Sequence, residues 1–400
     1  MTTGVEVRDY PFGTPGHPEV YALFARLRRE EPVSRIRLPY GGEAWLVTRY
    51  DDAKAVLADR RFSRAAVVGR DDIPRIIPAP APGNSLLSMD PPEHTRVRTL
   101  IGKVFTPRRI EGMRPRIQEI VDGLLTAMMQ AGPSVDLVAS LALPLPVIVI
   151  CEILGVPEED QYRFREFSGI VMSTTAHTRE EIVAARMAFK GYLAELISQR
   201  RRHPTDDLLG ALVCARDGDD RLSEEELVDL GVVLLLAGHE STANQIASFV
   251  YALLTAPQEW ERMCSNLKLV PAAVEELLRY LPVGAGGSFA RVALEDVTVG
   301  EVTVRAGESV FVNLQAANRD ETVFDGPENL DLARSNNPHM AFGYGLHRCV
   351  GAQLARMELQ IALASLLERF PGLHLAVSAA EVPWKAGMLV HGPRALPVSW

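Results

Sequence analysis

The stretch Phe342-Gly-Tyr-Gly-Leu-His-Arg-Cys-Val-Gly351 places Cys349 in a glycine-rich loop. The residues after Ala352 carry leucine and isoleucine at helical spacing, so the loop is predicted to lead into a helix. A helix start carries partial positive charge and free N–H groups, and glycines let backbone amides approach the sulfur closely. We therefore expect Cys349 to be held as a thiolate. The alternative is an inert, buried cysteine that acts as a small hydrophobic side chain.

The composition is that of a soluble globular protein. Of the 400 residues, 47% are hydrophobic and 23% are charged, which suffices for a large core and a hydrated surface. The net charge of -9 argues against a nucleic acid or an anionic membrane as a partner. The longest apolar run, residues 141–151, is too short to cross a bilayer, and the N-terminus lacks a signal-peptide pattern.

Four cysteines are scattered along the chain, at Cys151, Cys214, Cys264 and Cys349, and form no CxxC pair. This spacing disfavours a zinc site and a disulfide framework. The first three lie in apolar helical contexts, so we expect them to be core residues. A reducing cytoplasm is the expected setting for such a cysteine pattern. The protein is also expected to be a monomer.

The order of the predicted elements indicates a mainly α fold with a minor β part. Helical periodicity dominates from Glu93 to Glu276, interrupted by turns that contain proline. Residues 67–88 are rich in proline and small residues and predict a long loop of the kind that often carries function. No linker or repeat divides the chain, so we expect one domain over residues 1–400. Short strands are expected near residues 33–38, 44–48, 297–304 and 309–314.

A long, mostly apolar helix is predicted to begin near Ser223, which forms a capping-box pattern with Glu226. Farther along, the same helix carries Glu240 next to Ser241 in apolar surroundings. Taken alone, this pair is also explained by a helix-end cap or by a buried polar pair.

Two further pairs lie at helical spacing. Glu276 and Arg279 are three residues apart among apolar neighbours, a spacing that most often reflects an ordinary surface ion pair. His94 and Arg98 are four residues apart, so both can face one cluster of carboxylates. Each spacing is a weak signal without its context.

Together these motifs resemble those of the cytochrome P-450 family, in its soluble bacterial class. The resemblance rests on the Cys349 loop, the segment Ala237-Gly-His-Glu-Ser-Thr242 and the motif Glu276-Leu-Leu-Arg279, and it covers nearly the whole chain. Segments such as residues 88–96 also resemble actinomycete enzymes that tailor macrolides and other polyketides. The resemblance implies the cytochrome P-450 fold and a haem b cofactor (iron protoporphyrin IX).

The same resemblance implies roles for individual residues. Cys349 is expected to be the proximal iron ligand, in a loop shaped by Phe342, Gly343 and Gly351. The residues expected to bind the haem propionates are His94, Arg98, Arg291 and His347. Glu276 and Arg279 are expected to form a structural ion pair. The family's third arginine of that network has no evident counterpart, because Asn329 stands in its place, so a weaker network is expected.

In the long helix, Ala237 and Gly238 are expected to leave room over the haem. Glu240 and Ser241 would deliver protons while dioxygen is activated. The family usually has threonine where this chain has Ser241, and serine keeps the hydroxyl but loses the methyl group that restricts χ1. No catalytic role is expected for His239.

The resemblance implies a monooxygenase that hydroxylates or epoxidises a lipophilic secondary metabolite, a polyketide or macrolide. A terpene, a steroid or a carrier-bound peptide is an alternative substrate, and a non-catalytic haem-thiolate sensor is an alternative of another class. The pocket is expected to be roomy and apolar. Its expected contact residues are Leu86, Leu87, Val171, Met172, Val283, Gly284, Met388 and Leu389.

Electrons are expected to come from other proteins, because the sequence has no nicotinamide or flavin fingerprint. The expected source is a ferredoxin with its NAD(P)H-driven ferredoxin reductase. An acidic ferredoxin would dock on a local basic patch despite the negative net charge. The residues expected to form that patch are Arg96, Lys103, Arg108, Arg109 and Arg348.

Overall fold

The structure is a computed structural model that describes residues 6–13, 18–83, 85–205, 207–215, 222–281, 283–284 and 289–400. Within these ranges it leaves out the side chains at positions 103, 104, 162, 164, 165, 211, 214 and 215. The predictions for the side chains of Lys103 and Cys214 therefore lie outside the described residues.

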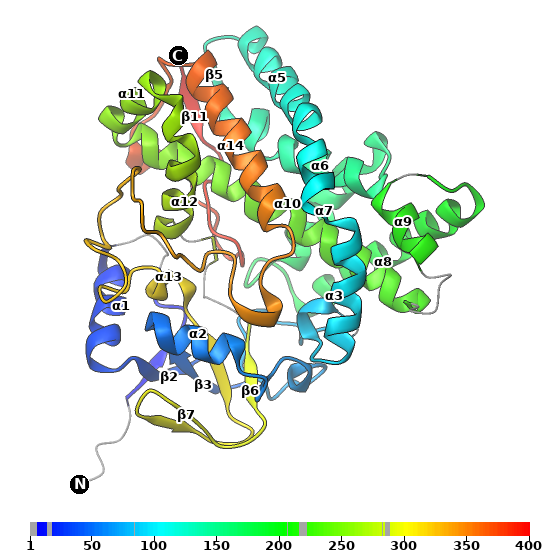
Figure 1. Ribbon diagram of the computed structural model, residues 1–400, viewed down its shortest axis with the longest axis vertical. Coiled ribbons are helices and arrows are strands. Elements are labelled where there is room, and N and C mark those ends of the chain that lie inside the picture. Colours follow the sequence, from blue (N-terminus) through cyan, green and yellow to red (C-terminus); the bar gives the residue numbers. More distant parts are fainter. Residues whose placement is uncertain are drawn as a thin grey trace.

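Helices make up most of the described chain (Figure 1), which confirms the mainly α prediction. The first seven are α1 (Pro18–Glu30), α2 (Tyr50–Ala58), α3 (Glu93–Val104), α4 (Pro107–Gly112), α5 (Arg114–Ala131), α6 (Pro144–Leu154) and α7 (Gln161–Val171). The others are α8 (Arg179–Arg202), α9 (Leu208–Ala215), α10 (Glu224–Leu254), α11 (Pro257–Ser265), α12 (Val270–Tyr280), α13 (Leu314–Ala317) and α14 (Ala352–Arg369).

The strands form a larger sheet and two small ones. The larger sheet has the order β1-β2-β3-β9-β6-β4, and β3 pairs in parallel with β9, a strand from far along the chain. Its strands are β1 (Val7–Asp9), β2 (Val33–Arg37), β3 (Glu43–Val47), β4 (Phe62–Ser63), β6 (Arg291–Ala293) and β9 (Ser309–Val312). The small sheets contain β5 (Ser134–Asp136), β10 (His374–Leu375) and β11 (Pro397–Ser399), and the hairpin of β7 (Val297–Val299) with β8 (Val302–Val304).

Helix α10 is the central element of the helical part. It packs against α6, α8 and α14, and it is buried on nearly all sides. Its start matches the prediction, because Ser223 caps the helix and the Glu226 carboxylate accepts a hydrogen bond from the Ser223 backbone N–H. A helix that is buried on nearly all sides needs apolar side chains on all of its faces. The polar residues in its middle therefore need hydrogen-bond or ionic partners.

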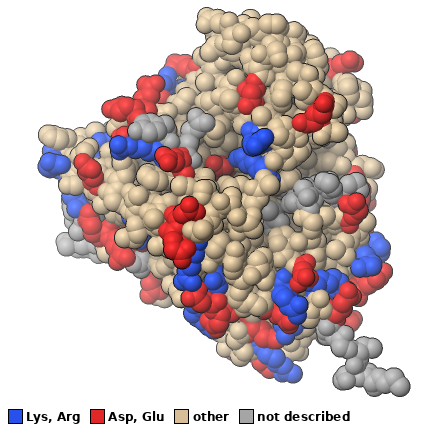
Figure 2. Space-filling view, turned by 180° about the vertical axis from the view of Figure 1, so that it is seen from behind, with Lys and Arg blue, Asp and Glu red and all other residues tan. Residues whose placement is uncertain are grey.

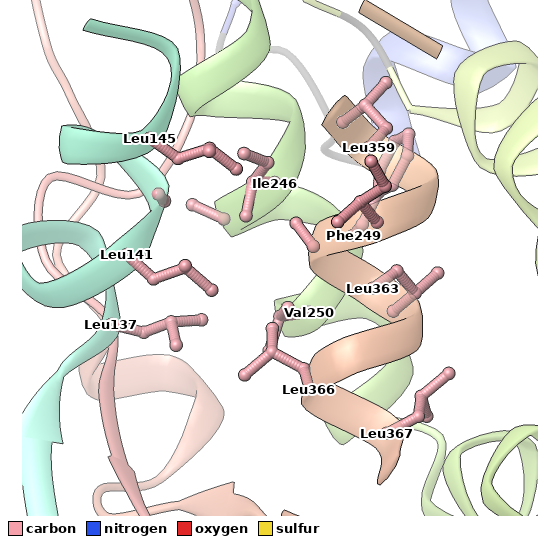
Figure 3. Close-up of a cluster of buried hydrophobic side chains, with 14 of the residues drawn as sticks. Leu137, Leu141, Leu145, Ile246, Phe249, Val250, Leu359, Leu363, Leu366 and Leu367 are labelled. Atoms are coloured by element: carbon pink, nitrogen blue, oxygen red, sulfur yellow. The ribbon is translucent and has the colours of Figure 1, made fainter. Parts of the chain in front are cut away.

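The largest hydrophobic cluster holds α10, α14 and the segment before α6 together. Figure 3 shows Leu137, Leu141 and Leu145 facing Ile246 and Val250 of α10, with leucines of α14 on the other side. Each fully buried leucine contributes about 1.5–3 kcal/mol to the free energy of unfolding. This packing fixes α14, and the loop that precedes it, relative to α10.

Most sequence expectations for the elements are confirmed. The described residues of the long loop over 67–88 form short helical turns and isolated bridges, and the helix after Cys349 begins at Ala352. The strands β1, β4, β5, β6, β10 and β11 were not predicted, because two or three residues carry too little alternation to be recognised. In Figure 1 the larger sheet lies at one end of the molecule, with α14 and the other long helices beyond it.

The face seen in Figure 2 has acidic and basic side chains interspersed, with broad uncharged areas between them. Among the described residues, no helix combines the length and apolar character that a bilayer crossing requires.

Candidate functional site

The Cys349 loop is tightly folded against α2. The Cys349 backbone N–H donates a hydrogen bond to the Phe342 carbonyl oxygen at 2.8 Å, which closes the loop. Gly345 has a φ of +70°, and a Cβ there would overlap the backbone of Leu57, so this position requires glycine. Cys349 is exposed, whereas Cys151 is buried and its thiol pKa is raised to about 12 by burial. Cys349 is thus not packed as a core cysteine.

Opposing effects of the protein act on the pKa of the Cys349 thiol. Although the side chain is accessible, many protein atoms surround it, and this burial raises the thiol pKa. The backbone N–H of Gly351 and the charges of Arg98 and Arg348 offset the increase only in part. The helix start and the glycines therefore offset only part of the burial effect, and the thiolate form of Cys349 stays a prediction. Helix α14 begins three residues after the cysteine, and a bound metal cation would favour the thiolate by replacing the proton.

Five cationic or imidazole side chains gather beside this loop, and we call them the cationic cluster: Arg64, His94, Arg98, Arg291 and His347. The rings of His94 and His347 have centroids 4.4 Å apart. Burial, followed by the positive charge of the other four members, lowers the pKa of His347 to about 3. Burial also lowers the pKa of Arg64 to about 9 and that of Arg291 to about 10.

Protein groups compensate this positive charge only sparsely. Among the described residues, Asp90 is the one carboxylate whose negative charge raises the pKa of Arg64, His94 and Arg291. His94 is 1% exposed, yet neither of its ring nitrogens has a hydrogen-bond partner among the described residues. Buried cations and orphaned imidazole nitrogens are costly without anionic partners. The cluster therefore fits an anionic ligand, and the two propionates of haem have the required charge and acceptor oxygens.

The cationic cluster joins the four predicted propionate residues with one that the sequence did not reveal. Arg64 follows β4 and has no recognisable motif, and it reaches the cluster only because β4 pairs with β6, which carries Arg291. Its guanidinium donates to the carbonyl oxygens of Leu87 and Ala290. These bonds fix the cation between the long loop and the larger sheet.

Phe342 is braced from the side of α12 and α14. The Arg356 guanidinium lies over its ring, 4.5 Å from the centroid, and forms two hydrogen bonds to Glu275 at 2.7 and 2.8 Å. His339 lies 2.9 Å from the same carboxylate. Burial alone would raise the pKa of Glu275, but these two partners outweigh it and lower the pKa to about 2. This brace was not recognised in the sequence, since it joins three separate segments.

Glu276 and Arg279 form a fully buried ion pair with two bonds of 2.7 Å. The Arg334 guanidinium donates a further hydrogen bond to Glu276 at 3.0 Å. The expectation that the network lacks a third arginine is therefore wrong, because Arg334 supplies it five residues after Asn329. Asn329 contributes its backbone carbonyl oxygen to Arg279 instead. The ordinary surface pair is excluded by the complete burial of both side chains.

The polar residues of α10 point in different directions. Ala237 is exposed and Ser241 is partly exposed, so this stripe of the helix faces open space, as expected. Gly238, in contrast to the expectation, does not border this open space, because a Cβ there would lie 2.7 Å from Ile150 of α6. The glycine instead permits close packing of two helices. His239 is buried, lies 2.9 Å from the Ser168 hydroxyl and 2.7 Å from the Leu235 carbonyl oxygen, and has no role in the open stripe.

Glu240 and Ser241 are adjacent, but no hydrogen bond joins their side chains in the described structure. The Ser241 hydroxyl donates to the Ala237 carbonyl oxygen at 3.2 Å. The Glu240 carboxylate is 6% exposed and accepts hydrogen bonds from Asn244, Lys385 and Ser168. Glu240 is therefore a buried carboxylate with its own set of partners, not a helix-end cap.

Three of the segments predicted to contact substrate meet one another. The Leu389 backbone N–H donates to the Met172 carbonyl oxygen at 2.8 Å, and Gly284 forms a bridge with Val390. Val171 is buried beside them at the end of α7. The residues that form this candidate wall are Val171, Met172, Val283, Gly284, Met388 and Leu389. Leu86 instead belongs to the core cluster around α3 and α6, while Leu87 is 36% exposed.

Comparison with known proteins agrees with this geometry. A family model described as "Cytochrome P450" matches residues 259–376. The chain is 59% identical to nocardicin C N-oxygenase of Nocardia uniformis subsp. tsuyamanensis and 50% identical to mycinamicin IV hydroxylase/epoxidase of Micromonospora griseorubida. Both alignments cover 100% of each protein.

Solved structures extend the agreement to the fold. The crystal structure of the LnmA cytochrome P450 hydroxylase, from the leinamycin pathway of Streptomyces atroolivaceus S-140, superposes with a TM-score of 0.90 at 51% identity. That match covers 98% of this chain and 100% of the other. The identities and coverage are high enough to decide membership: this chain belongs to the cytochrome P450 family, whose members are haem b monooxygenases.

Proposed function

We propose that the cationic cluster would bind the two haem propionates and that the Cys349 thiolate would ligate the iron. The observation that carries this proposal is the uncompensated positive charge around His94, next to an accessible cysteine. Phe342, held by Arg356, would shield the sulfur side, and Gly343 and Gly351 would let the backbone approach the cofactor. Charge-assisted hydrogen bonds from the cluster to the propionates would add affinity and fix the haem's orientation.

When bound, haem supplies the chemistry that activates dioxygen and transfers one oxygen atom to the substrate. The role of the protein chain is to position the substrate, exclude water and move protons. Ala237 leaves the open stripe of α10 free of large side chains. We assign proton delivery to Glu240 and Ser241, which requires the Ser241 hydroxyl to turn away from the Ala237 carbonyl oxygen.

A non-catalytic haem sensor would not need a buried carboxylate beside a hydroxyl on this helix. Although burial opposes the charged form of Glu240, Lys385 and His239 outweigh it, so the chain keeps a charged group in its interior beside a hydroxyl. The monooxygenase proposal accounts for both residues, and the sensor alternative accounts for neither.

For the substrate, we propose a lipophilic secondary metabolite of the polyketide or macrolide class, hydroxylated at carbon or epoxidised. Small and apolar residues form the candidate wall, which offers a large substrate few ionic anchors. The mycinamicin hydroxylase/epoxidase supports this substrate class by its similarity. The higher identity to an N-oxygenase favours oxygenation of a substrate nitrogen as a second candidate reaction.

A substrate panel tests these two reactions. The haem-loaded protein is titrated with macrolides and other polyketides, including mycinamicin IV, and with nocardicin C, while the Soret band is recorded. Each binder is then turned over with dioxygen, a ferredoxin, its reductase and NADPH, and products are identified by mass. A product with one added oxygen on carbon supports the first candidate, and an N-oxygenated product supports the second. Absence of binding and turnover across the panel contradicts both.

For the electron source, we propose a ferredoxin that docks near the Cys349 loop. Arg108 and Arg348 are exposed and would face an acidic partner. Arg96 is less suited than expected, because it is paired with Glu226. Replacing Arg108 and Arg348 by glutamine should slow reduction by ferredoxin at low salt and leave reduction by dithionite unchanged.

A further inference from the structure

The C-terminal segment Pro383–Arg394 folds back on itself beside α10. The Lys385 backbone N–H donates to the Gly392 carbonyl oxygen at 3.0 Å, and that of Arg394 donates to the Pro383 carbonyl oxygen at 2.7 Å. Across the segment, the rings of Trp384 and His391 stack with centroids 4.8 Å apart. We call this segment the C-terminal hairpin. Its backbone and ring contacts make it a defined element, not a loose tail.

The C-terminal hairpin is pressed onto α10 at Asn244 and Tyr251. A Cβ at Gly392 would overlap the Asn244 side chain, so the glycine allows the closest possible approach. Trp384 packs edge-on against Tyr251, with centroids 5.1 Å apart. Asn244 lies one helical turn after Glu240 and donates to its backbone carbonyl oxygen at 2.6 Å. The hairpin is therefore anchored within one turn of the proposed acid.

From this anchored position Lys385 reaches Glu240. The ammonium nitrogen lies 3.3 Å from one carboxylate oxygen, Oε2, which also accepts a hydrogen bond from Asn244 at 3.3 Å. The other oxygen, Oε1, is 3.4 Å from the Ser168 hydroxyl and 3.9 Å from the His239 ring. Burial would raise the pKa of Glu240, but the charges of Lys385 and His239 outweigh it, so the pKa is lowered.

A cavity of about 410 Å³ borders this pair. It is lined by Glu166, Glu240 and Lys385 together with Arg394, Asn244 and four apolar side chains. Glu166 and Arg394 are exposed, so the cavity connects the buried carboxylate with solvent. The Glu240 carboxylate thus borders charged, water-accessible groups on the side of the cavity. The proposed reaction side lies on another stripe of the same helix, at Ala237 and Ser241.

We propose that Lys385 is a positioning residue that holds Glu240 ionised and turned toward this cavity, so that the acid takes up protons from solvent there. The inference rests on the proposed role of Glu240 in proton delivery. The charged and titratable groups that face Glu240 are Lys385 of the hairpin, His239 of α10, Glu166 of α7 and Arg394 of the hairpin. Among the described side chains, Lys385 is the one permanent cation that contacts the carboxylate, so its charge sets the pH at which Glu240 is available.

The test is Lys385→Met, with Arg394→Met as the matched control. The control removes a cation from the same cavity without a contact to Glu240. The infrared band of the protonated Glu240 carboxyl, identified by its loss in Glu240→Gln, is followed against pH. We expect its midpoint to rise by about one pH unit or more in Lys385→Met, because an adjacent cation typically lowers a carboxyl pKa by about 1–3 units. Lys385→Arg should restore the wild-type midpoint, and Arg394→Met should leave it nearly unchanged.

Product formed per electron is measured over the same pH range. Lys385→Met should shift this profile upward in pH by the same amount as the infrared midpoint, with the thiolate–haem spectrum unchanged. An unshifted midpoint in Lys385→Met, or an equal shift in Arg394→Met, overturns the inference. If instead Glu240→Gln leaves the yield unchanged at every pH, the proposed role of Glu240 fails, which is a separate result.

Discussion

The cationic cluster and the surroundings of Glu240 differ in how far the protein itself compensates buried charge. Around His94 the protein collects positive charge and provides little compensation, leaving two imidazole nitrogens without partners. Around Glu240 every contact is supplied by the chain itself, from Ser168, Asn244 and Lys385. We propose that a ligand completes the first region, whereas the folded chain itself completes the second. Substitutions in the two regions should therefore damage different properties.

The largest effect is expected at Cys349, the proposed ligand of the haem iron, which lies beside the cationic cluster. Cys349→Ser should abolish the reduced, CO-bound absorption band that is characteristic of thiolate ligation, because a neutral hydroxyl cannot replace an anionic sulfur donor. The measurement is the reduced-CO difference spectrum of the purified variant. An unchanged band would show that another residue ligates the iron.

Glu276 belongs to a buried ion-pair network whose partners are all supplied by the folded chain. Glu276→Ala would leave Arg279 and Arg334 buried without their carboxylate, and such a loss typically costs about 3–5 kcal/mol of unfolding free energy. Urea denaturation of the haem-free protein measures this loss. Glu111→Ala, which removes an exposed partner of Arg114, is the control and should change stability little. Equal losses in the two variants would contradict the structural role of the network.

Substitutions in the cationic cluster should instead weaken haem binding and leave the stability of the haem-free protein nearly unchanged. In His94→Ala with Arg98→Ala, haem retention should fall, since each lost charge-assisted hydrogen bond is worth about 1.5–3 kcal/mol. The stability of the haem-free protein should change little or increase, because uncompensated groups are removed. Haem occupancy after dilution and urea denaturation without haem give the two values. Full occupancy would place the propionates elsewhere, and a large loss of haem-free stability would make the cluster structural.

The smallest effect on the molecule as a whole is expected at Ser241. Ser241→Ala removes one partly exposed hydroxyl, so folding and haem binding should be nearly unchanged, within about 0.5 kcal/mol. Product per electron should fall and peroxide should rise, because proton delivery is less well directed. Ser241→Thr, which restores the family's usual residue, should match or exceed the wild type. If Ser241→Ala couples as well as the wild type, water or a substrate hydroxyl carries the proton.

Local sequence determined the elements and the residues whose partners lie close along the chain. Ser223 and Glu226 fixed the start of α10, Glu276 and Arg279 met across one helical turn, and the glycines around Cys349 defined its loop. These features depend on interactions within a few residues, so spacing alone reveals them. Resemblance then supplied the family and its haem, which the comparisons confirmed.

Tertiary structure alone decided which distant residues complete each site. Arg334 joins Glu276 from 58 residues away, Lys385 reaches Glu240 across 145 residues, and Arg64 enters the cationic cluster through strand pairing. No periodicity relates such positions, because the packing of whole helices and sheets brings them together. The burial that raises the thiol pKa of Cys349 likewise comes from the entire fold and not from the local helix start.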